Sequence, residues 1–234
     1  MNNQIAPDLV KLHNIFQPIL QVDHHLHAKV DAYEMLTRDT KGTFPGIQFL
    51  HSLTTQKGND YWIDISQQAL DQVLADHPQR KIYINLEPCQ MEFSNVWAFL
   101  DTIYQRYHNQ VAIEITERRE ATHSLDYLDD EIHRLKDMGY ELAIDDVSAG
   151  SNSYAFIVRQ LSVIHRIKLS HLIFRNEDQE IRRNFVNAWQ TFALHHHLDF
   201  VIEGIANREL AQEFAGNPMV LQQGFYWGKG SANI

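Results

Sequence analysis

Cysteine is almost absent from this chain, since Cys89 is the only one among 234 residues. A single cysteine excludes an internal disulfide, and this is the usual situation in a reducing compartment. The sequence also lacks the basic start and apolar stretch of a secretory signal, and it has no apolar run long enough to cross a membrane. We therefore expect a cytoplasmic protein with no membrane partner.

Positive charge is also scarce. The chain has 20 Lys and Arg residues against 30 Asp and Glu residues, which gives a formal net charge of -10. This balance argues against binding to a nucleic-acid polymer, because such proteins normally present a basic face. It does not argue against a small phosphate ligand, since bound cations reverse the local field. With 44% hydrophobic residues and no visible linker or repeat, residues 1–234 are expected to form one domain.

Apolar runs of strand length alternate with segments of helical spacing. Two strands are predicted first, at residues 15–22 and 28–36, and the short polar run between them favours an antiparallel hairpin. Residues 39–60 look loop-rich, and a helix is predicted over 66–75 with Ser66 as its N-cap. Six further strands follow, near residues 81–86, 111–116, 141–144, 166–168, 199–205 and 220–225, with helices between them. This order predicts an α/β fold, a modified TIM (β/α)8 barrel whose first strand is antiparallel to the rest.

Acidic residues end one predicted strand after another: Glu34, Glu114, Asp145 with Asp146, and Glu203, while Asn85 ends a further strand. Parallel strands of a barrel bring their C-terminal ends to one face, and that face carries the chemistry. Crowded carboxylates repel one another unless cations neutralise them, and oxygen ligands suit Mg²⁺ or Mn²⁺. Any one such acid is more often simply solvated, but the ordered set predicts a metal site.

Eight short segments, taken in order, resemble the motifs of the EAL domain family, the phosphodiesterases of cyclic di-GMP. They include Gln17-Pro18-Ile19 for "QPI", YEMLTR at 33–38 for "EALLR", EITE at 114–117 for "E-x-T-E" and DDVSAG at 145–150 for "DDFG-[TA]-G". Asn85, KLS at 168–170, EGIA at 203–206 and QGF at 223–225 resemble the remaining elements. Each segment is weak alone, but together they span residues 16–228. The resemblance implies hydrolysis of cyclic di-GMP to linear pGpG by two-metal activation of water.

The resemblance also implies a role for each matching residue. Two divalent cations, Mg²⁺ or Mn²⁺, would be held by Glu34, Asn85, Glu114, Asp145, Asp146 and Glu203, with Asp145 bridging them. Glu203, Lys168 and Glu34 would act in catalysis, with Lys168 near the attacking water. Gln17, Leu36, Arg38 and Gln223 would contact the substrate, and Glu117 would brace the loop after Asp145. Such a pair of cations suits phosphodiester cleavage, because it lowers the pKa of a bound water and clamps the phosphate.

Several neighbouring residues depart from the family pattern. Val147 and Ser148 stand in place of Phe and Gly, Ser170 in place of Asp, and Ala206 in place of Glu. If position 148 needs a positive φ, a serine there is strained. An alternative is therefore a catalytically weak or inactive module that binds cyclic di-GMP or a protein partner as a regulator. A metal-dependent phosphodiesterase for another nucleotide is a further alternative. We expect no attached sensory domain, and a homodimer is a further expectation.

Other residue groups carry weaker signals. The histidines at 24, 25 and 27 and at 195–197 lack the companions of a zinc site. No activating base for Cys89 is evident, so we interpret this thiol as inert. Phe225, Tyr226 and Trp227 predict either a stacking platform for a guanine base or ordinary packing.

Overall fold

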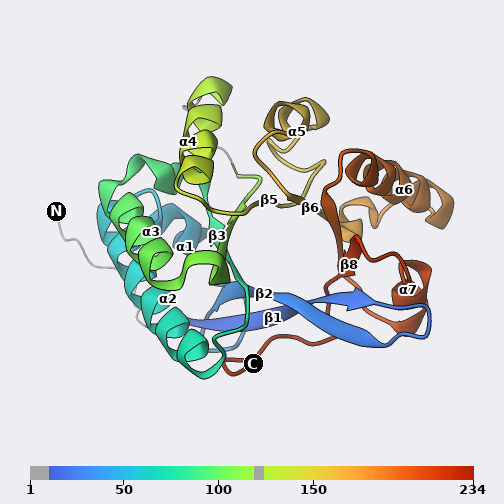
Figure 1. Ribbon diagram of the computed structural model, residues 1–234, viewed down its shortest axis with the longest axis horizontal. Helices are drawn as coiled ribbons and strands as arrows, with labels where there is room; N and C mark the ends of the chain where they lie inside the picture. The colour runs from blue at the N-terminus through green and yellow to red at the C-terminus, as the bar shows by residue number, and fades with distance from the viewer. Residues whose placement is uncertain (1–10, 119–123) are drawn as a thin grey trace.

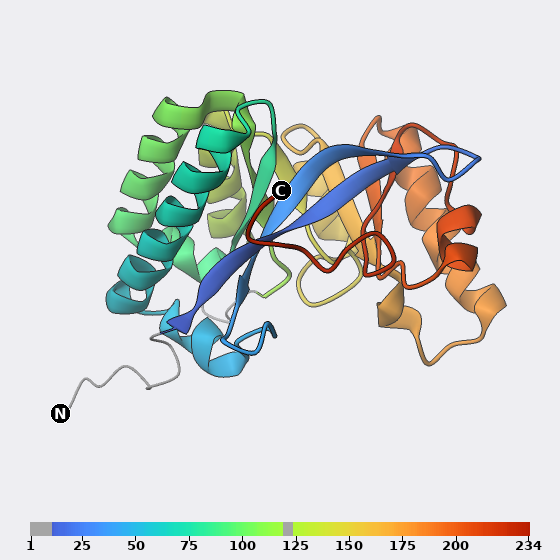
Figure 2. The same ribbon diagram turned by 90° about the horizontal axis from the view of Figure 1, so that it is seen from below.

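The computed structural model describes residues 11–118 and 124–234, and its strands close into one barrel with helices packed along its flanks (Figures 1 and 2). The strands pair in chain order, and the last returns to the first. β1 is antiparallel to both of its neighbours, and the other pairs are parallel. The predicted modified barrel with an antiparallel first strand is therefore confirmed. The strands are β1 His13–Val22, β2 Ala28–Arg38, β3 Ile82–Leu86, β4 Val111–Ile115, β5 Leu142–Ile144, β6 Arg166–Ser170, β7 Asp199–Glu203 and β8 Val220–Gln222.

Helices pack along the barrel except over most of the β1–β2 hairpin, as Figure 2 shows, and Figure 1 shows α2 and α3 side by side against one flank. None of the helices in the described part of the chain combines the length and the apolar character needed to cross a bilayer. Among the described residues the helices are α1 Ile47–Ser52, α2 Gln56–Asp76, α3 Ser94–Tyr107, α4 Leu125–Asp137, α5 Tyr154–Gln160, α6 Gln179–His195 and α7 Arg208–Glu213. Short 3-10 turns are η2 Pro88–Glu92, η3 His108–Gln110 and η4 His171–Phe174.

Helix α2 begins ten residues before the predicted start, so the assignment of Ser66 as an N-cap was wrong. Thr55 caps the helix instead, because its side chain accepts a hydrogen bond of 3.1 Å from the Gly58 amide. Ser66 is fully buried one helical turn after Trp62 and one turn before Leu70. Part of the predicted loop at 39–60 is also helical, since α1 and the first turn of α2 lie there. The polar first turn of α2, which includes a glycine, concealed the helical pattern.

The barrel interior holds a packed apolar layer. One inward-facing cluster joins residues of seven strands: Ile19, Ala32, Tyr83, Ala112, Ala143, Val201 and Leu221. Tyr83 is the only large ring of this cluster, and three of its other members are alanines. The small side chains leave room for the ring. Side chains therefore fill the interior of the barrel, as in other eight-stranded barrels, and the described residues leave no channel through this layer. Polar side chains on the same faces must therefore gather beyond this layer.

Candidate functional site

The candidate site lies directly above the apolar layer, two residues further along each strand. Side chains at i and i+2 of a strand point to the same face. The step from Ala32 reaches Glu34, and equivalent steps on the other parallel strands reach the polar residues of the site. These are Asn85 after Tyr83, Glu114 after Ala112, Asp145 after Ala143, Glu203 after Val201 and Gln223 after Leu221. The fold thus brings together the strand-end residues singled out in the sequence.

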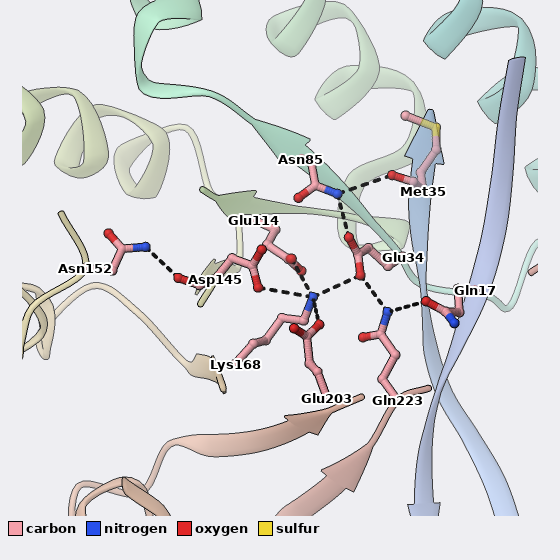
Figure 3. Close-up of polar contacts among 10 residues, drawn as sticks. All are labelled: Gln17, Glu34, Met35, Asn85, Glu114, Asp145, Asn152, Lys168, Glu203 and Gln223. Atoms are coloured by element: carbon pink, nitrogen blue, oxygen red, sulfur yellow. Dashed lines mark hydrogen bonds and ion pairs between the residues drawn. The ribbon is translucent and has the colours of Figure 1, made fainter. Parts of the chain in front are cut away.

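Lys168 of β6 occupies the centre of this group and is fully buried. Its Nζ lies 2.9 Å from Glu34 Oε2, 2.5 Å from Glu114 Oε1, 2.7 Å from Glu203 Oε1 and 3.5 Å from Asp145 Oδ1 (Figure 3). Four carboxylates from four strands or the residue directly after a strand therefore surround one ammonium group. One ammonium cannot balance all four carboxylates when they are ionised, so the site has a marked preference for further cations or protons.

Glu34 is held by amide donors as well as by the ammonium. Asn85 Nδ2 donates to Glu34 Oε1 at 2.7 Å, and Gln223 Nε2 donates to Glu34 Oε2 at 2.6 Å. Gln223 also donates to Gln17 Oε1 at 3.1 Å, and Gln17 donates to the Gly228 carbonyl at 2.8 Å. This chain of contacts, of which Figure 3 shows those among Gln17, Glu34, Asn85 and Gln223, fixes the carboxylate of Glu34 in one orientation. It also ties β1 to the C-terminal segment.

Proton affinities differ sharply across the cluster. Burial alone would raise the pKa of Glu34, but the charge of Lys168 and the amide donors lower it below its ordinary value. Burial, together with the negative charge of Glu34, raises the pKa of Glu114 well above the ordinary value. Burial also raises the pKa of Glu203 to about 8, although Lys168 opposes the shift. Glu203 therefore holds a proton near neutral pH until a stronger positive charge displaces it.

The loop after β5 carries the second aspartate. Burial, and then the charge of Asp145, raise the pKa of Asp146 to about 7. Asp146 has a φ of 43° and Ser148 a φ of 77°, both in the left-handed region that favours glycine. The strain expected for a serine at position 148 is thus present.

Two residues outside the strands hold this loop in place. The Glu117 carbonyl accepts hydrogen bonds from the Ser151 amide at 3.0 Å and the Ser151 hydroxyl at 2.9 Å. Asn152 Nδ2 donates to the Asp145 carbonyl at 2.5 Å. Asn152 is 1% exposed and was not among the predicted residues. A buried asparagine seven residues after the aspartate has no signature in a single sequence.

Unused oxygen atoms show that the residues fit divalent cations. Three buried carboxylate oxygens accept no hydrogen bond within the described structure: Glu114 Oε2, Asp145 Oδ1 and Asp146 Oδ1. Oxygens of Glu117, Asp145 and Asp146 come within 4.8 Å of one another, a spacing that one ion can bridge. Hard oxygen donors of this kind suit Mg²⁺ and Mn²⁺. Glu117, predicted to brace the loop, is thereby also a candidate ligand.

A cavity opens beside Glu34 and runs along the end of β2. It is lined by the predicted substrate residues Leu36 and Arg38 and by apolar side chains that include Phe44, Phe49 and Trp62. Glu87 and Arg118 line the same cavity, with Oε1 of Glu87 3.4 Å from a guanidinium nitrogen of Arg118. Carboxylates, arginines and an apolar wall thus meet in one recess, and this combination suits a ligand with both phosphates and flat rings.

The remaining candidates are the hairpin histidines, Cys89 and the aromatic residues near the C-terminus. His24, His25 and His27 lie at the tip of the β1–β2 hairpin, where the His24 carbonyl accepts a hydrogen bond from Gln212 of α7. Cys89 is buried in η2. Phe225 is 66% exposed, whereas Trp227 is half-buried and donates to Gln222 Oε1 at 3.0 Å. Among the three aromatic residues, exposure therefore favours Phe225 over Trp227 as a stacking surface.

Solved structures share this fold. The EAL enzyme Bd1971 in its cGMP-bound form superposes with a TM-score of 0.73 at 19% identity, over 94% of this chain and 62% of that one. The PaMucR phosphodiesterase in complex with c-di-GMP gives 0.69 at 21% identity, over 93% and 91%. The Klebsiella pneumoniae BlrP1 complex with manganese and cy-diGMP gives 0.68 at 22% identity, over 95% and 56%. This chain thus spans less than two thirds of Bd1971 and of BlrP1.

A comparison with curated proteins finds no match. The model of the EAL domain matches residues 3–230. That match covers nearly the whole sequence and includes each strand whose end carries a carboxylate of the site. The barrel with its antiparallel first strand is consistent with this match to the family. The chain belongs to the EAL domain family.

Proposed function

We propose that this protein is a metal-dependent phosphodiesterase that hydrolyses cyclic di-GMP to linear pGpG. The observation that carries the proposal is the ring of carboxylates around Lys168 at the C-terminal face of an EAL-family barrel. The PaMucR and BlrP1 structures contain c-di-GMP, and this supports the choice of substrate. The manganese in the BlrP1 complex supports Mg²⁺ or Mn²⁺ as the cofactor.

Two cations would be held by the strand-end residues. Glu34, Asn85, Glu114 and Asp145 would bind the first, and Asp145, Asp146 and Glu203 the second, with Glu117 close to the latter pair. When bound, the cations supply a lowered pKa for water and positive charge for the phosphoryl oxygens. With Lys168 they would balance the five carboxylates that the sequence places at strand ends, so that an anionic diester can enter.

The protein residues would orient the reactants and move protons. Product pGpG carries a 5′-phosphate, so a water oxygen attacks phosphorus while the bond from phosphorus to the ribose O3′ breaks. Glu203 would accept the water proton at its carboxylate, and the leaving ribose O3′ would take up one proton from solvent water. Lys168 donates hydrogen bonds at the centre of the site and holds Glu34 and Glu114 in position. Gln223 donates to Glu34 and to Gln17, so it orients the Glu34 carboxylate, and both glutamines would contact the substrate.

Substrate binding would use the cavity at the end of β2. Arg38 would contact a phosphate, and Leu36 would pack against the nucleoside. Arg38 is half-buried, and its Nη1 donates to the Thr37 carbonyl at 3.0 Å, so other guanidinium N–H groups remain to donate to a phosphate. A homodimer and a cytoplasmic location remain predictions.

Hydrolysis by the purified protein tests the proposal. Cyclic di-GMP is incubated with the metal-free protein, with and without added Mg²⁺ or Mn²⁺, and pGpG is followed by chromatography. We expect product only with metal, and none from Glu34→Ala. Asp130→Ala removes an exposed carboxylate on α4 and should match the wild type. Turnover that persists without metal, or in Glu34→Ala, would contradict the proposal.

A regulatory module without turnover is the second candidate. The left-handed φ of 77° at Ser148 favours it, because strain in the loop after Asp145 can displace a metal ligand. In that case the same experiment would show tight binding of cyclic di-GMP without product at saturating Mg²⁺ or Mn²⁺.

A further inference from the structure

A hydrogen bond joins the loop after β5 to helix α6. Trp189 Nε1 donates to Ser148 Oγ at 2.6 Å, across 41 residues of sequence. The indole belongs to the buried face of α6 and is 8% exposed. Figure 1 shows α5 and α6 on the same side of the barrel, beyond β5 and β6. The contact therefore connects the segment that carries Asp145 and Asp146 to a long outer helix.

The loop needs such a contact because its backbone is strained. Asp146 and Ser148 both have positive φ values, which cost free energy in any residue other than glycine. Backbone hydrogen bonds hold parts of the turn, from the Val147 amide to the Lys168 carbonyl at 2.9 Å and from the Ser148 amide to the Asn152 carbonyl at 3.0 Å. These bonds tie the loop to the barrel and to itself. The Ser148 hydroxyl ties it to α6.

We propose that Ser148 and Trp189 form a latch that positions Asp146 for the second metal ion. With the latch closed, the loop keeps the conformation in which Asp146, Asp145 and Glu117 bring oxygens within 4.8 Å of one another. Trp189 is thus a positioning residue that acts through Ser148 and touches neither metal nor substrate. The inference rests on the proposed function, since it assigns the second cation to this loop.

The two members of the latch depend on each other. A buried indole N–H without an acceptor is unfavourable, and so is a serine held at positive φ without a compensating contact. Each residue therefore offsets the cost of the other, and removing either should have the same consequence. This reciprocity separates a latch from two independent packing contacts.

Two conservative variants isolate the hydrogen bond. Ser148→Ala removes the hydroxyl but keeps the Cβ and the backbone restriction. Trp189→Phe removes the N–H donor but keeps an aromatic ring beside Tyr154 and Phe192, which contact the indole at ring distances of 6.4 and 5.5 Å. Trp97→Phe is the matched control, because Trp97 Nε1 donates to the Met91 carbonyl at 2.7 Å beside α3, away from the loop.

The decisive measurement is calorimetric titration of Mn²⁺ into the metal-free full chain, for the wild type, both single variants, their double variant and the control. We expect two sites in the wild type. The Kd of one site should rise about fivefold to tenfold in either single variant, as the loss of one hydrogen bond predicts. The double variant should bind no more weakly than the single ones, and the other site and Trp97→Phe should stay unchanged.

Hydrogen exchange of the metal-free proteins provides a readout that needs no metal. Peptides covering residues 145–152 should exchange faster in Ser148→Ala and Trp189→Phe, while those from β3 and β4 should not, which also shows that the variants fold. A merely structural contact would lower the thermal stability and leave the Mn²⁺ affinity of the folded protein intact. If the wild type binds Mn²⁺ at two sites and both single variants bind it with the same affinities, the latch alone would be overturned. No Mn²⁺ binding by the wild type would overturn the proposed function and, with it, this role of the loop.

Discussion

Lys168 Nζ lies 2.7 Å from Glu203 Oε1, although the two residues do not face each other in the sheet. Lys168 pairs with Val201 in the register of β6 and β7, whereas Glu203 pairs with Ser170. The lysine thus starts two residues below the carboxylate, and its four-carbon chain carries the charge up into the cluster. The ammonium reaches the carboxylates from the side of the apolar layer and offsets part of their negative charge. The opposite side, beyond the strand ends, is the side on which a ligand would enter.

Removal of this ammonium should make folding depend on metal. We expect Lys168→Met to lose about 3 kcal/mol of unfolding free energy in the metal-free protein, because it leaves buried carboxylates without a partner. Urea unfolding with and without Mn²⁺ measures this, and added Mn²⁺ should restore part of the loss. Lys136→Met, at an exposed position of α4, should change little. An equal loss with and without Mn²⁺ would show that the cluster does not take up the cation.

The buried Asn152 should matter for both stability and metal affinity. Asn152→Ala removes the 2.5 Å hydrogen bond to the Asp145 carbonyl, so we expect a loss of about 1–2 kcal/mol in unfolding free energy. Because the loop also carries Asp146, Mn²⁺ binding should weaken in the folded variant. Thermal unfolding and metal titration of the same preparation check both effects. Asn233→Ala, at an exposed position near the C-terminus, is the control, and equal Mn²⁺ affinity in the two variants would exclude a role for Asn152.

Arg38 should act on substrate binding more than on turnover. We expect Arg38→Ala to raise KM for cyclic di-GMP about tenfold or more, the size of one lost charge-assisted hydrogen bond, with a smaller effect on kcat. Steady-state kinetics at saturating Mn²⁺ separate the two parameters. Arg106→Ala removes an exposed arginine that pairs with Asp71 in α2 and should leave both unchanged. A fall in kcat with an unaltered KM would assign Arg38 to the chemical step instead.

His165 lies directly before β6, at the end of the barrel opposite the carboxylates, and should make the unfolding free energy sensitive to acid. Its Nε2 lies 2.7 Å from the Tyr83 hydroxyl, and burial, followed by the charge of Arg166, lowers its pKa from 6.5 to about 4. Between these values the unfolded chain binds a proton that the folded protein does not. The unfolding free energy therefore falls as the pH drops from 6.5 to 4, by at most about 1.4 kcal/mol per pH unit from this group.

Urea unfolding between pH 4 and 7 tests this linkage against His165→Gln. Glutamine can still contact the Tyr83 hydroxyl but does not titrate, so its stability curve should be flatter than the wild-type curve in this window. Two parallel curves would mean that His165 is protonated equally in the folded and unfolded chains.

Much of the fold could be predicted from the residues alone. Strand-length apolar runs, a short polar turn at 23–27 and regular helical segments predicted the closed barrel and its antiparallel first strand, because both period and connection length are local properties. The start of α2 was missed for an equally local reason. Ser66 has the chemistry of a helix cap, but it lies in the buried stripe between Trp62 and Leu70, and only packing reveals that.

The sequence by itself determined which residues share the inner face of each strand, since alternation places Glu34 on the same face as Ala32 and Glu114 on the same face as Ala112. Only the tertiary structure decided what these residues meet. Lys168 reaches carboxylates up to 134 residues away because eight strands close around one axis. The contact of Asn152 with Asp145 and the hydrogen bond between Trp189 and Ser148 likewise depend on tertiary packing. No local sequence pattern indicates that these residues lie close together. Periodicity fixes the direction of a side chain, whereas its partners depend on closure of the barrel and on how each helix packs against it.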